Sequence, residues 1–129
     1  MRVFKNAWFA RFARKEEIAD QALWDAVVRA EQGQIDADLG GGVIKQRLAR
    51  AGAGKSGGYR SIVLYRQGDK AFFVFGFAKN ELDNISKDEG RDFKKMAKYV
   101  LALTDVQLQS LVENRQFEEM VNDGKKVSE

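Results

Sequence analysis

The spacing of hydrophobic residues predicts helices toward both ends of the chain and strands in the middle. Residues 2–13 begin as a short strand and pass into a helix, and residues 16–33 form a clearer helix. In the clearer helix, apolar residues recur at helical spacing, and Gly33 stands where the helix is expected to stop. The apolar residues are Ile18, Ala22, Leu23, Ala26, Val27 and Ala30.

The sequence "GGGVIKQRLAR" at residues 40–50 changes to the alternation of a strand. Ile44 and Leu48 would face one side of a sheet, and Lys45 and Arg47 the other side. The two sides differ in character, because one is aliphatic and the other is basic. This strand therefore predicts a sheet with a basic region on one face.

Two more strands follow, one around residues 62–65 and one over residues 71–79, with a turn at 67–69 between them. Short connections join consecutive strands here, which favours an antiparallel meander. The last strand is rich in phenylalanine, and we expect these rings, Phe75 among them, to lie in the core.

The C-terminal part of the chain carries two helix starts. Ser86 with Glu89 three residues later is a capping box, and Thr104 with Gln107 marks a second start. The tail from Asn122 is polar. The order of elements predicts an α+β fold, a small antiparallel β-sheet with N-terminal helices packed on it and C-terminal helices.

The composition limits the available chemistry. The chain has 129 residues, which suits one domain with a single core, and it contains neither cysteine nor histidine. Disulfides, thiolate metal sites, cysteine nucleophiles and the usual general base are therefore absent. The N-terminus has charges among its apolar residues and predicts neither a signal peptide nor a membrane span, so we expect a cytoplasmic protein without a membrane partner.

Positive charge is concentrated in one segment. Between Lys45 and Lys79 there are eight basic residues and a single acid, Asp69, although the whole chain carries a net charge of only +3. A basic block within an otherwise mildly acidic chain is typical of a polyanion site. The alternative is that strand ends and loops carry Lys and Arg for solvation or edge protection.

The stretch "RAGAGKSGGYRS" at residues 50–61 resembles a nucleotide-binding loop only in part. A Walker loop requires a glycine five residues before Gly54, where this chain has Ala49, and it must open a helix. Here a strand-like run follows instead. The stretch is interpreted as a glycine-rich hairpin, which argues against nucleotide hydrolysis.

The segments "GGGVIKQRLARAGAGKSGGYRSIVLYR" and "FFVFGFAKNELDNIS" resemble the RelE/ParE superfamily of bacterial toxins. Within it they are similar to the HigB-type RelE toxins of type II toxin-antitoxin systems, in a G-K-x-G-G-x-R hairpin and an F-x-K-N-E segment. The similarity implies a toxin domain over residues 1–103, with residues 104–129 as a helical extension and polar tail of the same domain.

The resemblance implies an mRNA interferase, an endoribonuclease that cleaves translated mRNA in the ribosomal 30S A site. It implies no metal and no cofactor, and as a partner a cognate antitoxin encoded beside the toxin. The catalytic residues that it implies are Lys45, Arg47, Arg60 and Lys79, with Lys55 matching the hairpin lysine. Many relatives place a tyrosine shortly after the position of Lys79, whereas Leu82 and Ile85 follow here. A tyrosine acid or base is therefore not supported.

These residue types suit RNA cleavage by the 2′-hydroxyl of RNA itself. Arg60, with Arg47 beside it, would stabilise charge on the phosphoryl oxygens, because guanidinium pairs with two oxygens at once. Crowding by arginines lowers the pKa of a lysine, which leaves Lys45 and Lys79 both open as base or acid. Clustered carboxylates for a metal are not found near this block.

Four further residues are candidates for contact with RNA. Arg50 and Lys55 belong to the basic block, and Tyr59 and Phe77 flank basic positions, where their rings are candidates for stacking on a base. Ordinary packing in the sheet is the alternative for both rings.

Other functions remain open at this stage. A ParE-like relative would share the fold and inhibit DNA gyrase without cleaving RNA, and the basic residues on the strands argue against it. A degenerate relative would only bind RNA or its antitoxin. The sequence leaves base preference and ribosome dependence undecided.

Overall fold

A computed structural model gives the fold, and it describes residues 1–49, 58–78 and 85–121. Its helices and strands alternate in a mixed order along the chain. They are β1 (Arg2–Asn6), α1 (Ala7–Lys15), α2 (Asp20–Glu31), β2 (Ala37–Gly40), β3 (Val43–Leu48), β4 (Tyr59–Arg66), β5 (Lys70–Ala78), α3 (Lys87–Val100), α4 (Asp105–Glu113) and β6 (Phe117–Glu119). The predicted α+β class is confirmed.

The strands form one six-stranded sheet in the order β2-β3-β4-β5-β1-β6. β3, β4 and β5 make the predicted antiparallel meander. The sheet as a whole is mixed, however, because β1 lies parallel to β5, with Arg2 opposite Lys70. The sequence did not predict this pairing or the short strands β2 and β6, since partners that are distant in the chain leave no local periodicity.

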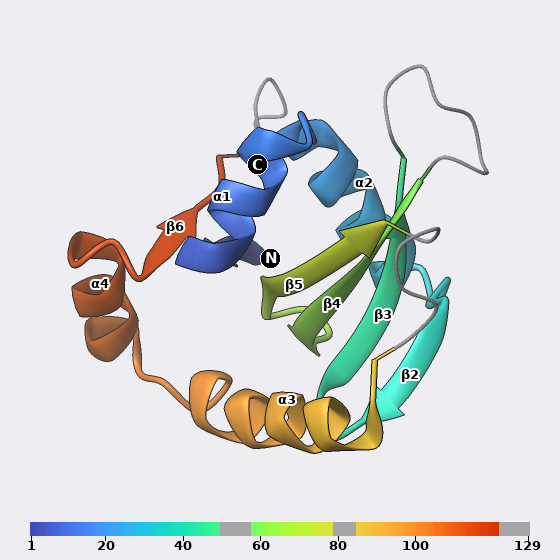
Figure 1. Cartoon of the computed structure of the whole chain (residues 1–129). Helices are drawn as coiled ribbons and strands as arrows, with labels where there is room; N and C mark the ends of the chain where they lie inside the picture. Colours follow the sequence, from blue (N-terminus) through green and yellow to red (C-terminus); the bar gives the residue numbers. More distant parts are fainter. Residues whose placement is uncertain (50–57, 79–84, 122–129) are drawn as a thin grey trace.

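The sheet separates two hydrophobic clusters (Figure 1). One cluster joins α1 and α2 to the sheet through residues such as Phe9, Leu23 and Val63. The other joins α3 and α4 to the opposite face through residues such as Ile62, Ala97 and Leu108. The molecule is therefore three-layered, and each face of the sheet is covered by its own helices.

Local signals in the sequence explain how the elements begin. Asn6 ends β1 and caps α1, since its side-chain oxygen accepts from the backbone N–H of Phe9 at 2.7 Å. The capping boxes at Ser86 and Thr104 are both present. α1 packs closely on β5, because a Cβ added at Gly76 would lie 2.5 Å from the Phe12 ring.

Phe75 does not occupy the core position expected of it. It is only partly buried, whereas Phe72 and Phe73 in the same strand are fully buried. Phe75 lies on the α3 side of the sheet, where it packs against the edge of the α3 cluster and is only partly covered by it. Its ring therefore contributes to the surface between α1 and α3.

Candidate functional site

One end of the sheet gathers three basic side chains on the face toward α3. Arg47 of β3 lies directly opposite Arg60 of β4, and Lys45 lies opposite Ile62. Ile62 belongs to the α3 cluster, and strand alternation carries all three basic residues to its side of the sheet. Paired residues in antiparallel strands have Cα atoms about 5 Å apart. The three cations therefore lie within the span of a few phosphate groups.

The two arginines differ in their partners. Arg47 is exposed, and its Nε lies 3.4 Å from Oδ1 of Asp36, while its backbone N–H donates to the other carboxylate oxygen at 2.6 Å. Arg60 is half-buried and forms no ion pair with any residue in the described ranges. Arg60 is therefore better placed to offer its full charge to a phosphate.

A buried glutamine holds Asp36 in place. Gln46 donates to the carbonyl oxygens of Ala26 at 2.9 Å and Gln34 at 3.2 Å, and it accepts from the backbone N–H of Asp36 at 2.7 Å. Ser61 of β4 donates to the carbonyl oxygen of Gln46 at 2.9 Å. The polar groups of Gln46 are thus satisfied inside the core, and the turn before β2 is fixed beside Arg47.

The surroundings of Asp36 determine its protonation. Burial acts to raise the pKa of Asp36, but the N–H of Arg47 and the charges of Arg47 and Arg29 outweigh it, and the pKa is lowered. Arg29 lies 3.5 Å from Asp36 and also donates to the carbonyl oxygen of Arg47 at 2.6 Å. Asp36 therefore stays ionised and offsets part of the positive charge on Arg47.

The basic block of the sequence does not form one patch. Arg66 and Lys70 lie at the far end of the β4–β5 hairpin, about 20 Å along the strand from Arg60. Both flank Asp69, at 3.4 and 3.1 Å. The hydrogen bond from Lys70 and the charges of Lys70 and Arg66 lower the pKa of Asp69. These cations are neutralised locally and are separate from the candidate site.

The two rings expected to stack on RNA are in the core. Tyr59 is 1% exposed, its hydroxyl donates to Glu16 at 2.6 Å, and its ring contacts Phe12 edge-on. Phe77 is 5% exposed and packs near Phe75. The alternative of ordinary sheet packing holds for both, because Tyr59 packs against Phe12 of α1 and Phe77 packs beside Phe75 on the opposite face of the sheet.

Three of the predicted site residues, Arg50, Lys55 and Lys79, lie outside the described residues. Sequence reasoning also missed residues that shape the site, namely Asp36 and Arg29, which come from other parts of the fold. No local signal marks them. Asp36, eleven residues before Arg47, becomes its partner only after β2 pairs with β3.

Two further observations concern the residues that the structure describes. Among them, no group of three or more carboxylate, histidine or cysteine side chains could hold a metal ion. None of their helices is long and apolar enough to cross a membrane.

The family model described as "RelE toxin of RelE / RelB toxin-antitoxin system" matches residues 1–120 of the sequence. The chain belongs to the RelE toxin family. No curated protein matched it. The match extends through α4 and β6, and β6 pairs with β1 at the edge of the sheet. Membership identifies the protein as the toxin of a toxin-antitoxin system, with an antitoxin as its partner.

Proposed function

We propose that this RelE-family toxin is a metal-independent endoribonuclease that cleaves translated mRNA in the A site of the 30S ribosomal subunit. The observation that carries the proposal is the register pair Arg47–Arg60 with Lys45 on the same face of the sheet. The G-K-x-G-G-x-R and F-x-K-N-E segments support the HigB-type subgroup. A cytoplasmic location follows from the proposed substrate.

The chemistry needs no cofactor. The 2′-oxygen of RNA attacks the adjacent phosphorus, the bond from phosphorus to the 5′-oxygen breaks, and a 2′,3′-cyclic phosphate forms. A base accepts the proton of the 2′-hydroxyl, and an acid protonates the leaving 5′-oxygen. Lys45 and Lys79 are the candidates for these two roles. Arg60 stabilises the negative charge that grows on the phosphoryl oxygens, and Arg47 assists it.

Arg60 has the leading role for an electrostatic reason. An arginine that already faces a carboxylate, as Arg47 faces Asp36, presents a weaker field to an incoming phosphate. Arg60 has no such partner among the described residues. It also stands in the middle of the sheet, where pairing with β3 and β5 fixes its backbone on both sides.

Induced expression in a bacterium, with mapping of mRNA 5′ ends, tests the proposal. Cuts that cluster within translated codons are expected, and they should disappear when translation initiation is blocked. Growth arrest with intact mRNA would contradict the proposal, and trapped DNA gyrase in such cells would favour a ParE-like activity instead.

A further inference from the structure

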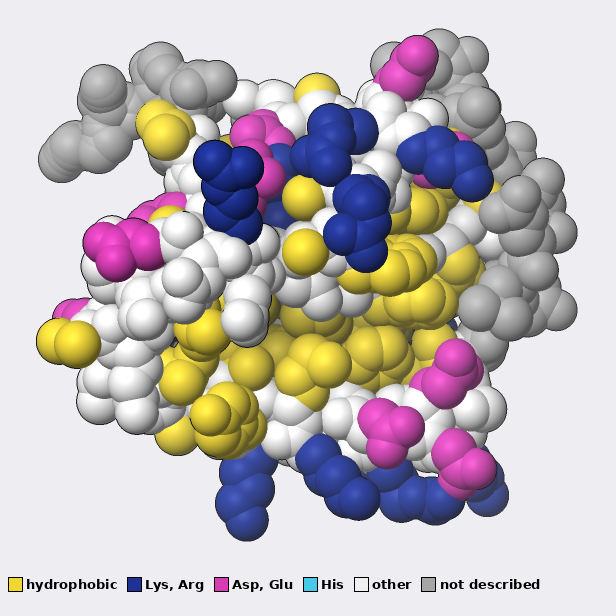
Figure 2. Space-filling view, turned by 60° about the vertical axis from the view of Figure 1, so that its left-hand side comes forward, with side chains coloured by type: hydrophobic (Ala, Val, Ile, Leu, Met, Phe, Trp, Pro, Cys, Tyr) yellow, Lys and Arg dark blue, Asp and Glu magenta, His cyan; other side chains and the backbone are white. Residues whose placement is uncertain are grey.

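A band of apolar side chains lies on the surface between α1 and α3 (Figure 2). Trp8 of α1 stacks on Phe12 at 5.3 Å and on Phe75 of β5 at 4.8 Å, and Phe75 packs against Phe93 of α3 at 5.8 Å. Trp8 is 38% exposed, and Met96 of α3 is 37% exposed. These five residues are called the apolar band. They leave a continuous hydrophobic surface open to solvent.

Three arginines border this band. Helical spacing places Trp8 and Phe12 on one stripe of α1 and Arg11 and Arg14 on the next stripe. Arg115, which follows α4, completes the group, and its φ of 64° is a left-handed conformation that an arginine rarely adopts. Arg11, Arg14 and Arg115 are called the arginine cluster.

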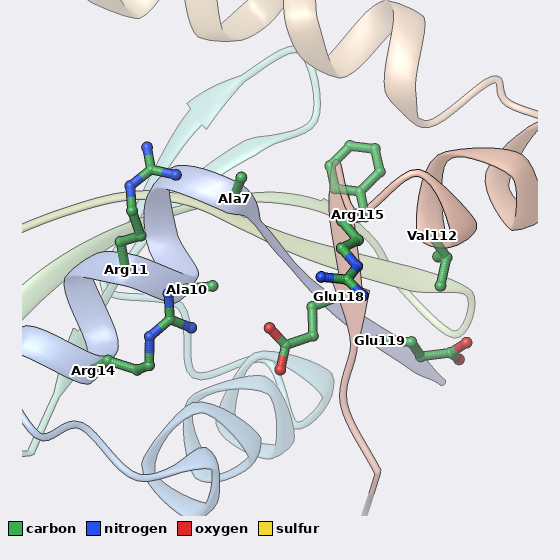
Figure 3. Close-up of a pocket in the computed structure, with 9 residues that line it drawn as sticks. Ala7, Ala10, Arg11, Arg14, Val112, Arg115, Glu118 and Glu119 are labelled. Atoms are coloured by element: carbon green, nitrogen blue, oxygen red, sulfur yellow. The ribbon is translucent and has the colours of Figure 1, made fainter.

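The arginine cluster lines a cavity of about 620 Å³ between α1 and β6, with small alanine side chains on the α1 side (Figure 3). Glu118 and Glu119 also line the cavity. Glu118 shares Lys5 with Asp20, at 3.6 and 3.0 Å, and Glu119 shares Arg2 with Asp105, at 2.9 and 3.7 Å. The three arginines make no ion pair with the residues described here. The lining of the cavity therefore carries three arginines against two glutamates, a small excess of positive charge next to the apolar band.

We propose that the apolar band and the arginine cluster together bind an acidic amphipathic segment of the cognate antitoxin. Apolar side chains on one face of the segment would cover the band, and carboxylates on its flank would pair with Arg11, Arg14 and Arg115. The proposal rests on membership of the toxin family, which supplies the antitoxin partner, and not on RNA cleavage.

A protein segment fits this surface better than RNA does. The Trp8 ring is already stacked on Phe12 and Phe75, and these contacts occupy the ring surface on which a base would stack. A protein segment supplies both aliphatic contacts for the band and carboxylates for the arginines. A nucleic acid supplies the negative charge but has few apolar groups with which to cover the apolar band.

The surface also adjoins the candidate RNA site. Phe75 is two positions from Phe77, which is the register partner of Arg60. A segment lying on the apolar band is therefore next to the strands that carry the basic residues. Occupation of the band by the antitoxin would restrict access to that end of the sheet.

Single-cysteine footprinting tests the proposal directly, because the natural chain contains no cysteine. Arg14→Cys and Met96→Cys place a thiol in the arginine cluster and the apolar band, and Gln32→Cys, on an exposed position after α2, is the control. Alkylation rates are measured for the toxin alone, with the purified antitoxin encoded by the adjacent gene, and with single-stranded RNA. The antitoxin should slow alkylation at Arg14→Cys and Met96→Cys by about tenfold or more, and leave Gln32→Cys unchanged.

Charge reversal gives a second readout by calorimetry. Arg11→Glu combined with Arg14→Glu should weaken antitoxin binding by about tenfold or more, whereas Lys15→Glu on the same helix, outside the cavity, should change it little. Equal alkylation with and without antitoxin would overturn the proposal, as would protection by RNA alone. Neither readout depends on cleavage, so failure of the proposed nuclease activity would leave both results interpretable.

Discussion

The two ends of the β4–β5 hairpin carry similar basic residues in very different electrostatic settings. At the turn, Asp69 lies within 4 Å of both Arg66 and Lys70 and neutralises them locally. At the other end, Arg60 has no acidic partner among the described residues, and Arg47 shares Asp36 with Arg29. The number of cations in a sequence segment therefore overstates the size of the site. Among the described cations of this hairpin, Arg60 is the one that no carboxylate offsets, which is why it leads the proposed site.

The largest expected effect is a loss of toxicity on substitution of Arg60, compared with substitution of Arg66 at the other end of the β4–β5 hairpin. Arg60→Ala should lose toxicity, because stabilising charge in the transition state is worth on the order of 3 kcal/mol, or about a hundredfold in rate. Arg66→Ala is the matched control and should remain toxic. Growth after induction and a melting curve are measured for both variants, and stability should fall by no more than about 1 kcal/mol. Full toxicity of a folded Arg60→Ala protein would remove the leading assignment.

Lys79→Ala should also reduce toxicity, by an amount similar to that of Arg60→Ala or smaller, if it transfers a proton or positions the phosphate. A positioned acid or base contributes about a hundredfold or more. Lys70→Ala, at the neutralised end, serves as the control and should leave toxicity unchanged. Cleavage of a ribosome-bound message by the purified variants provides the measurement. Equal rates for Lys79→Ala and wild type would leave Lys45 as the remaining lysine candidate.

Local sequence signals predicted much of the fold. The capping boxes, the helical stripe of α2 and the meander of β3, β4 and β5 all depend on neighbouring residues, and all are present. The parallel pairing of β1 with β5 was not predicted, because β1 reaches its partner only after two helices and three strands have intervened.

The same reasoning explains what was missed at the candidate site. Alternation along β3 placed Lys45 and Arg47 on one face correctly, since it is a local property. The burial of Tyr59 depends on Phe12 of α1 and on Glu16 just after it, and the ion pair of Arg47 depends on the turn before β2. Both contacts are made between segments that are far apart in the chain, so periodicity does not predict them.

Removing the Asp36 carboxylate beside the Arg47–Arg60 pair should increase the difference in charge between the two ends of the sheet. Asp36→Asn leaves Arg47 without an opposite charge, and RNA binding at low salt should strengthen. The ionised Asp36 also stabilises the fold, because its pKa is lowered below the unfolded value. This contribution is present above the unfolded pKa of about 3.9 and is lost as the pH falls through the folded pKa.

Melting curves of wild type and Asp36→Asn between about pH 7 and pH 3 measure the stability that the Asp36 charge contributes. This range covers the titration of an ordinary aspartate, whose pKa is about 3.9. The two proteins should differ by about 1 kcal/mol or less near neutral pH and converge as the solution becomes acidic. Asp69→Asn is the control at the other end of the hairpin, and it should leave RNA binding unchanged. A constant difference across the whole pH range would contradict the role assigned to the Asp36 charge.

The smallest expected effect concerns the salt dependence of RNA binding. Each phosphate contact to single-stranded RNA contributes a slope of about −0.7 to the logarithm of affinity against the logarithm of salt concentration. Arg60→Ala should therefore make the slope shallower by about 0.7. Arg66→Ala should leave the slope unchanged, because Arg66 already faces Asp69. Titration of a labelled oligonucleotide at several salt concentrations gives both values. If the two variants lose the same slope, the hairpin turn also contacts RNA, and the distinction between its two ends fails.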